Sequence, residues 1–194
     1  MNIKNSTLAP GFVRDDKLIK ELADGSDRAS VVLGAAIIEE LLERALKKRL
    51  VQKKSVMDKA FEGTTGSLGT FAGKIQIAYL SGLISEELYK DLEVLKSIRN
   101  KFAHNILGCD FLNPVVLELC HRFILVKSVF KTDSNWKNSK AKELFILEIM
   151  ALQTAMIRKI TRTTSLEPKE FETGELGFEE PEWAYLDGQE SKEE

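Results

Sequence analysis

Apolar residues recur along most of this chain at steps of three and four, the spacing that is typical of amphipathic helices. The most regular stretch spans 85–104, where one apolar stripe runs among charged and polar residues. The stripe consists of Leu88, Leu92, Leu95, Ile98 and Phe102. Ser85 is a favourable N-cap, and two glutamates follow it in the first turn, where the helix dipole stabilises negative charge. We therefore predict a helix over 85–104 with one face in a hydrophobic core.

Further segments carry a helical pattern, and most of them have recognisable ends. They are 15–23, 29–51, 68–79, 115–130 and 140–162. Ser26 is an N-cap for the second, Gly82 ends the third, and Asn113 followed by Pro114 opens the fourth. Within 13–162 apolar and polar residues do not alternate with period two over the length of a strand.

These patterns predict an all-α protein, built as a single helical bundle of about five to seven helices over residues 13–162. A chain of 194 residues is long enough for one well-buried domain and too short for two large ones. From residue 163 the periodicity stops and glutamates dominate. We expect residues 163–194 to form an acidic tail that is disordered or docked on the bundle.

The charge of the chain is unevenly distributed. The tail holds eleven acids against two lysines, so the net charge of −2 for the whole chain leaves +7 on the remainder. A basic cluster at the end of the helix predicted over 29–51 complements the helix dipole there. It consists of Lys47, Lys48, Arg49, Lys53 and Lys54. A charge of this size permits weak nucleic-acid binding but does not imply it.

Cysteine and glycine spacing gives no sign of a metal or cofactor. Cys109 and Cys120 have neither CxxC spacing nor a histidine at ligand spacing, and the glycines of 61–69 match no phosphate-binding motif. We therefore predict no cofactor and no metal. The sequence also lacks an apolar run that could span a bilayer and a signal core at its N-terminus, so we expect a cytoplasmic protein without a membrane partner.

The end of the helix predicted over 85–104 carries the candidate site. Arg99 lies seven residues after Leu92, close to the apolar stripe, and a buried guanidinium needs an anionic or carbonyl partner. Glu39 is a candidate partner. His104 stands at the helix C-terminus, where the dipole favours positive charge. Arg99 and His104 are therefore either structural caps of helix carbonyls or the two sides of an anion-binding groove.

Two stretches resemble the mannitol operon repressor family. They are GSLGTFAGKIQIAYLSGLIS and LYKDLEVLKSIRNKFAH, and the resemblance extends from about residue 26 to about residue 162, with its most specific part at 98–104. The resemblance implies a negative regulator of transcription. The sequence offers no helix-turn-helix pair with a recognition helix. We therefore expect a non-enzymatic repressor that acts mainly through contacts with a protein partner, such as a transcription factor, rather than by reading bases.

The same helix end is similar to the Arg-x4-6-His motif of HEPN domains, with Arg99, Asn100 and His104 on the pattern. HEPN domains are small helical bundles that often dimerise and include metal-independent ribonucleases. By this resemblance His104 would transfer a proton and Arg99 would hold the scissile phosphate, roles that suit their chemistry. A HEPN-like ribonuclease or RNA-binding domain is thus the alternative function.

A homodimer is the expected oligomeric state. The segment 140–162 is apolar over an unusually wide face, which indicates packing on two sides. One of these sides is available for a second copy of the chain.

Overall fold

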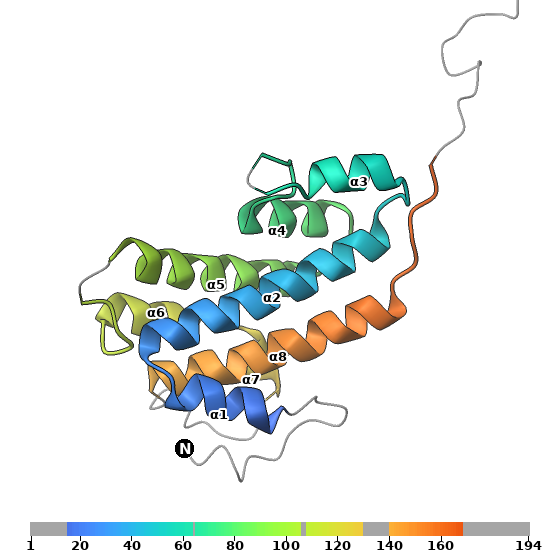
Figure 1. The fold of residues 1–194 in the computed structure, drawn as a ribbon. Coiled ribbons are helices and arrows are strands. Elements are labelled where there is room, and N and C mark those ends of the chain that lie inside the picture. Colours follow the sequence, from blue (N-terminus) through green and yellow to red (C-terminus); the bar gives the residue numbers. More distant parts are fainter. Residues whose placement is uncertain (1–14, 64, 106–107, 130–139, 169–194) are drawn as a thin grey trace, which may run out of the picture.

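Eight helices form the part of the chain that the computed structural model describes, namely residues 15–63, 65–105, 108–129 and 140–168 (Figure 1). These ranges contain no strand, so the all-α prediction is confirmed. The helices are α1 (Asp16–Asp24), α2 (Asp27–Arg49), α3 (Lys54–Ala60), α4 (Phe71–Leu80), α5 (Glu86–His104), α6 (Pro114–Arg122), α7 (Leu125–Val129) and α8 (Ala141–Arg162). Most of the predicted tail lies outside the described residues.

The predicted helix ends are present. Ser26 Oγ accepts a hydrogen bond from the Ala29 amide at 3.3 Å, and Asn113 Oδ1 accepts one from the Val115 amide at 3.0 Å. After α4, Gly82 adopts a φ of 65°, which a residue with a Cβ rarely adopts. Local side-chain chemistry therefore sets where these helices begin and end.

Helices α2 and α8 form the centre of the bundle. They lie side by side and run in the same direction, because contacts join them at both ends. Lys142 Nζ lies 3.3 Å from Asp27 Oδ1 near their N-termini, and Lys48 Nζ donates to Ile160 O at 2.7 Å near their C-termini. Helices α4 and α5 cover one side of α2, and α1 packs on both α2 and α8 (Figure 1).

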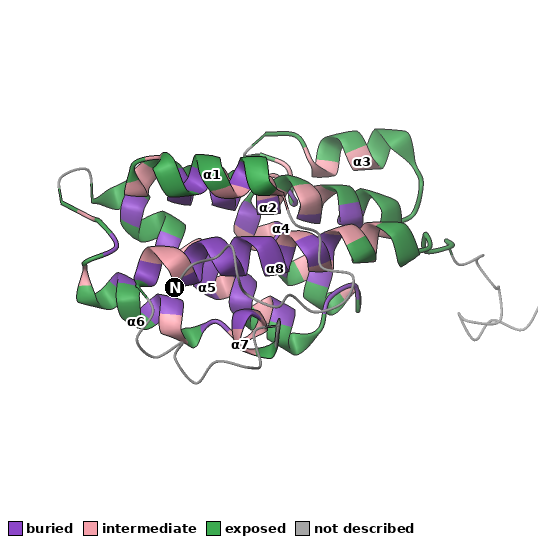
Figure 2. Cartoon of the chain, turned by 90° about the horizontal axis from the view of Figure 1, so that it is seen from below, coloured by how far each residue is buried: buried purple, intermediate pink, exposed green. Residues whose placement is uncertain are grey.

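The wide apolar face of α8 is used inside the monomer. This helix packs on α1, α2, α6 and α7, and its middle is buried almost all round (Figure 2). Phe145, Ile149 and Leu152 are each 0% exposed. The face that motivated the expectation of a dimer therefore contributes to the internal core, and it does not by itself indicate a second chain.

The prediction of one continuous helix over 115–130 is wrong in its middle. The chain turns at Phe123 and Ile124, so that α6 ends at Arg122 and α7 begins at Leu125. Phe123 is fully buried at this turn, and the Ile124 amide donates to a carboxylate of α5. Tertiary contacts thus interrupt a pattern that is locally helical. Among the described helices, none combines the length and apolarity that crossing a membrane requires.

Candidate functional site

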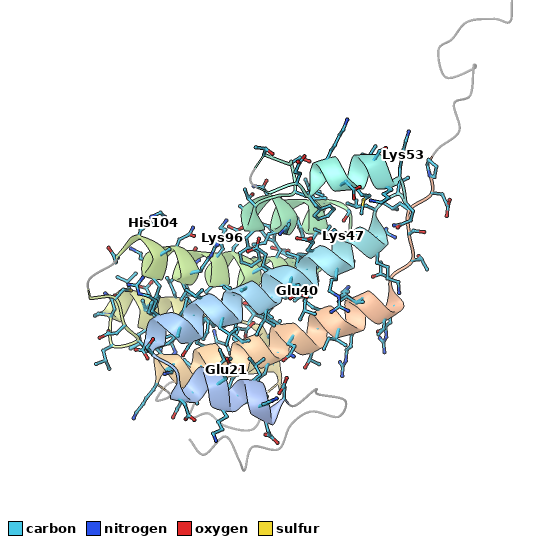
Figure 3. All side chains as sticks on the ribbon, viewed as in Figure 1. Glu21, Glu40, Lys47, Lys53, Lys96 and His104 are labelled. Carbon is cyan, nitrogen blue, oxygen red and sulfur yellow. The ribbon has the colours of Figure 1, made fainter. Side chains whose placement is uncertain are left out.

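Arg99, Asn100 and His104 are all exposed near the C-terminus of α5, which Figure 3 shows at one end of the bundle. The burial predicted for Arg99 is wrong. The buried face of α5 is centred on Leu95, Ile98 and Phe102, and Arg99 stands at its edge. Near the end of a helix fewer neighbours cover such an edge, so the guanidinium reaches solvent.

Glu39 does not serve as the partner of Arg99, because its carboxylate is paired with a lysine of α4. Lys74 Nζ lies 3.0 Å from Glu39 Oε1 and 2.8 Å from Glu43 Oε2. The Lys74 side chain is only 8% exposed. Burial lowers its pKa, but the hydrogen bonds and charges of Glu43 and Glu39 outweigh burial and hold the pKa above its ordinary value. The group is a partly buried ion triad, with only the lysine buried, that fixes α4 on α2.

The carbonyls at the end of α5 are capped by an arginine that the sequence analysis did not single out. Arg28 Nη1 donates to Phe102 O, and its Nη2 donates to Asn105 O at 2.7 Å. Arg28 thus has the structural role that was open for Arg99, and it ties the start of α2 to the end of α5. The only sequence signal was a basic residue in the first turn of a helix, where the dipole disfavours it.

Arg99 therefore stays available for contacts with a ligand or a partner. Asn100 and His104 are four residues apart and share one face of α5, whereas Arg99 and His104 are separated by about 140° around the axis. Lys101 adds a further exposed cation to this helix end. Among the described residues there is no cluster of three histidine, cysteine, aspartate or glutamate side chains that could hold a metal ion.

Apolar side chains are exposed next to this helix end, at the start of α6. Leu112 is 87% exposed and Val115 is 46% exposed, with the exposed Pro114 between them. The segment is held to the bundle because the Phe111 amide donates to Asp27 Oδ2 at 3.0 Å and the Phe111 ring packs on Phe102. We call Leu112, Pro114 and Val115 the α6 patch. Periodicity did not reveal it, because Leu112 precedes the helix.

Comparison with protein families decides what kind of chain this is. Residues 15–166 match the family model described as mannitol repressor (MtlR). This chain belongs to the mannitol repressor family. Neither a curated protein nor a solved structure matches it. The match to the mannitol repressor family includes all the described helices, the exposed end of α5 and the α6 patch.

This mannitol repressor family member also contains a buried pair of carboxyl groups at the start of α7. Asp91, 0% exposed, accepts from the amides of Ile124 and Leu125, each at 2.8 Å. Glu148, also 0% exposed, accepts from the Val126 amide at 2.9 Å. Asp91 of α5 and Glu148 of α8 thus accept hydrogen bonds from the three backbone amides at the start of α7.

The two carboxyl groups form a hydrogen bond with each other, although Glu148 Oε1 receives no N–H donor from the described part of the chain. Burial, reinforced by the charge of Asp91, raises the pKa of Glu148 well above its ordinary value. Burial also raises the pKa of Asp91, while the Leu125 and Ile124 amides oppose that shift. Burial therefore favours the protonated form of Glu148 more strongly than that of Asp91. The pair is structural, and no spacing along the chain indicates that the two acids meet.

Proposed function

We propose that this chain is a cytoplasmic, non-enzymatic regulator of the mannitol operon, which represses mainly through contacts with another protein. Membership of the mannitol repressor family supports the regulatory role. The observation that carries the indirect mode is the acidic start of α5, where Glu86 and Glu87 are exposed.

Helices α4 and α5 are joined by the short segment 81–85, as the two helices of a helix-turn-helix would be. A recognition helix contacts bases with its N-terminal residues, close to the phosphates of the major groove. In α5 this first turn carries the exposed Glu86 and Glu87, which the phosphates would repel. The remaining long helices, α2 and α8, form the centre of the core. Direct base reading is therefore disfavoured.

The α6 patch, together with the exposed end of α5, is the surface that we propose for the protein partner. An apolar centre with a polar and basic rim is the common composition of such interfaces. Leu112 and Val115 supply the apolar centre, and Arg99 and Lys101 supply the basic rim. The contact would bury side chains that are now surrounded by water.

The test combines two assays of the full chain. In a mobility-shift assay with mannitol-operon DNA at ~200 mM salt we expect no sequence-selective complex, since phosphate attraction alone collapses there. In a pull-down from the native cell we expect a specific protein, which Leu112→Asp no longer captures. Leu80→Asp is the matched control, because Leu80 is 77% exposed and lies on α4. A tight selective DNA complex would show that the indirect mode is wrong.

We also propose that the chain acts as a homodimer. A two-fold symmetric dimer is the commonest form of soluble homo-oligomer, and its interface would lie outside the α6 patch, which is left for the protein partner. Light scattering on the purified chain at micromolar concentration tests this. A mass of one chain across that range would rule the dimer out.

A second candidate function is cleavage of RNA by Arg99, Asn100 and His104. The observation that favours it is the exposure of all three side chains at one helix end, where a phosphate can reach them. If it is correct, the pure chain cleaves RNA without metal, and His104→Ala abolishes cleavage while the melting temperature stays the same. Intact RNA after prolonged incubation with the wild-type chain would exclude this function.

A further inference from the structure

A basic groove lies at the end of the bundle where α2 and α8 terminate. It has a volume of about 470 Å³, and its lining includes Arg49, Arg158, Lys159, Arg162, Thr163 and Thr164. The lining contains four cationic side chains and no carboxylate among the described residues. The groove is remote from the exposed end of α5: Figure 3 shows His104 at the opposite end of the molecule from Lys47 and Lys53, which lie near the C-terminus of α2.

Cations at a helix C-terminus often serve only to satisfy the last carbonyls. Lys48 does so here, with Nζ 2.7 Å from Ile160 O. Arg49 does not follow this pattern. Its Nη1 lies 3.4 Å from Thr164 O and its Nη2 lies 3.5 Å from Ser81 O, both at the outer limit of a hydrogen bond. Its buried Nε has no acceptor among the described residues. Capping therefore leaves most of the hydrogen-bonding capacity of this guanidinium unused.

The balance of charge in the groove favours an anion. The two helix C-termini contribute the equivalent of about half a negative charge each. Arg49, Lys159 and Arg162 alone outweigh that contribution. Guanidinium groups bind phosphate and carboxylate through paired N–H donors, and the volume falls within the range of small-molecule sites, about 300–1,000 Å³.

We propose that this groove is a binding site for a ligand that presents clustered anionic oxygens, as a phosphorylated small molecule does. Arg49 at the end of α2 and Arg162 at the end of α8 hold the anionic oxygens. The Thr163 and Thr164 hydroxyls are available as further donors. The same chemistry has a second source in this chain, because residues 169–194 carry ten acids. The inference does not depend on the proposed function, since partner capture and anion binding use opposite ends of the molecule.

The test is calorimetric titration of the full chain with pyrophosphate at constant ionic strength. We expect saturable binding with one site per chain. Arg162→Gln removes an exposed groove cation without disturbing the core and should weaken binding about tenfold, the loss of one charge-assisted hydrogen bond. Arg44→Gln, an exposed position on α2 outside the groove lining, is the matched control and should change affinity less than twofold. Binding that does not saturate, or that falls equally in both variants, would overturn the proposal.

A further experiment distinguishes an external ligand from the acidic tail, residues 169–194, as the source of the anionic oxygens. The full chain with Glu179, Glu180 and Glu182 changed to Gln keeps the groove and removes part of the acidic charge of the tail. If the tail occupies the groove, pyrophosphate binds several-fold more tightly to this variant than to wild type. An unchanged affinity assigns the groove to an external ligand. In either case, pyrophosphate binding that Arg162→Gln does not weaken would contradict the site.

Discussion

The carboxyl groups of Asp91 and Glu148 meet in the core, so that two acids 57 positions apart in sequence act as a single cap for the start of α7. Asp91 accepts two amide hydrogen bonds, whereas Glu148 accepts one and is favoured in its protonated form by burial. Burying one carboxylate with several donors costs far less than burying two charges side by side. The pair therefore makes the stability of the fold sensitive to pH.

We expect the contribution of Glu148 to stability to decrease as pH rises. Its folded-state pKa lies well above the ordinary value of 4.5, so the folded chain retains a proton that the unfolded chain loses. The contribution is fully present below about pH 4.5 and is lost as pH rises toward the folded-state pKa. Glu148→Gln mimics the protonated acid and should remove this slope. Urea unfolding of both proteins at pH 5, 6, 7 and 8 measures it.

Asp91→Asn, unlike Glu148→Gln, should destabilise the folded chain. Its single amide oxygen cannot replace both carboxylate oxygens that accept from Ile124 and Leu125, so we expect a loss of about 1–3 kcal/mol at pH 7. Equal stability of Asp91→Asn and wild type, or a slope that persists in Glu148→Gln, would contradict this account of the pair.

The ion triad of Lys74 makes a second prediction. Lys74→Met keeps the apolar stem but leaves Glu39 without its lysine, whereas Glu43 keeps Lys47, whose Nζ lies 2.6 Å from Glu43 Oε1. These carboxylates are 22% and 27% exposed, so water offsets part of the penalty, and we expect a loss of about 2 kcal/mol rather than the larger value for fully buried pairs. Lys90→Met, which breaks the exposed pair with Glu86, should leave the urea midpoint unchanged. Equal effects of the two variants would contradict this account.

The two arginines at the end of α5 should differ sharply. Arg28→Ala leaves the carbonyls of Phe102 and Asn105 without their donor and should cost about 1–2 kcal/mol. Arg99→Ala removes an exposed side chain and should change stability by less than about 0.5 kcal/mol. Thermal unfolding of the two variants tests the ranking, and a larger loss for Arg99→Ala would restore the structural role that the sequence suggested for it.

Thiol reactivity provides a fourth prediction. Burial raises the pKa of Cys120 to about 12, so this thiol should resist alkylation in the folded chain. Cys109 is half-buried, and burial and the charge of Asp110 raise its pKa more modestly. At pH 8 we expect slow modification of Cys109 alone, with Cys120 reacting only after urea is added. Mass spectrometry of the alkylated chain identifies the site.

The features that the sequence predicted correctly are those that depend on neighbours along the chain. Ser26 and Asn113 cap helices through amides two or three residues away, so local chemistry sufficed. The error at Arg99 has a geometric cause: Leu92, seven residues earlier, is fully buried in the middle of α5, whereas Arg99 lies near the end of the helix, where fewer neighbours cover it. The meeting of Asp91 with Glu148, and the role of Arg28, depend on how distant helices pack, and no spacing within one helix contains that information.

The parallel pairing of α2 with α8 has a consequence for synthesis of this protein. The first helix of the pair ends at Arg49 and its partner begins at Ala141, so the core cannot close until most of the chain has been translated. On the ribosome the face of α2 that packs on α8 stays uncovered through that interval, even where α4 and α5 already cover the other side, and such exposed apolar surface favours aggregation. A premature stop codon anywhere before α8 would therefore abolish the fold rather than shorten it.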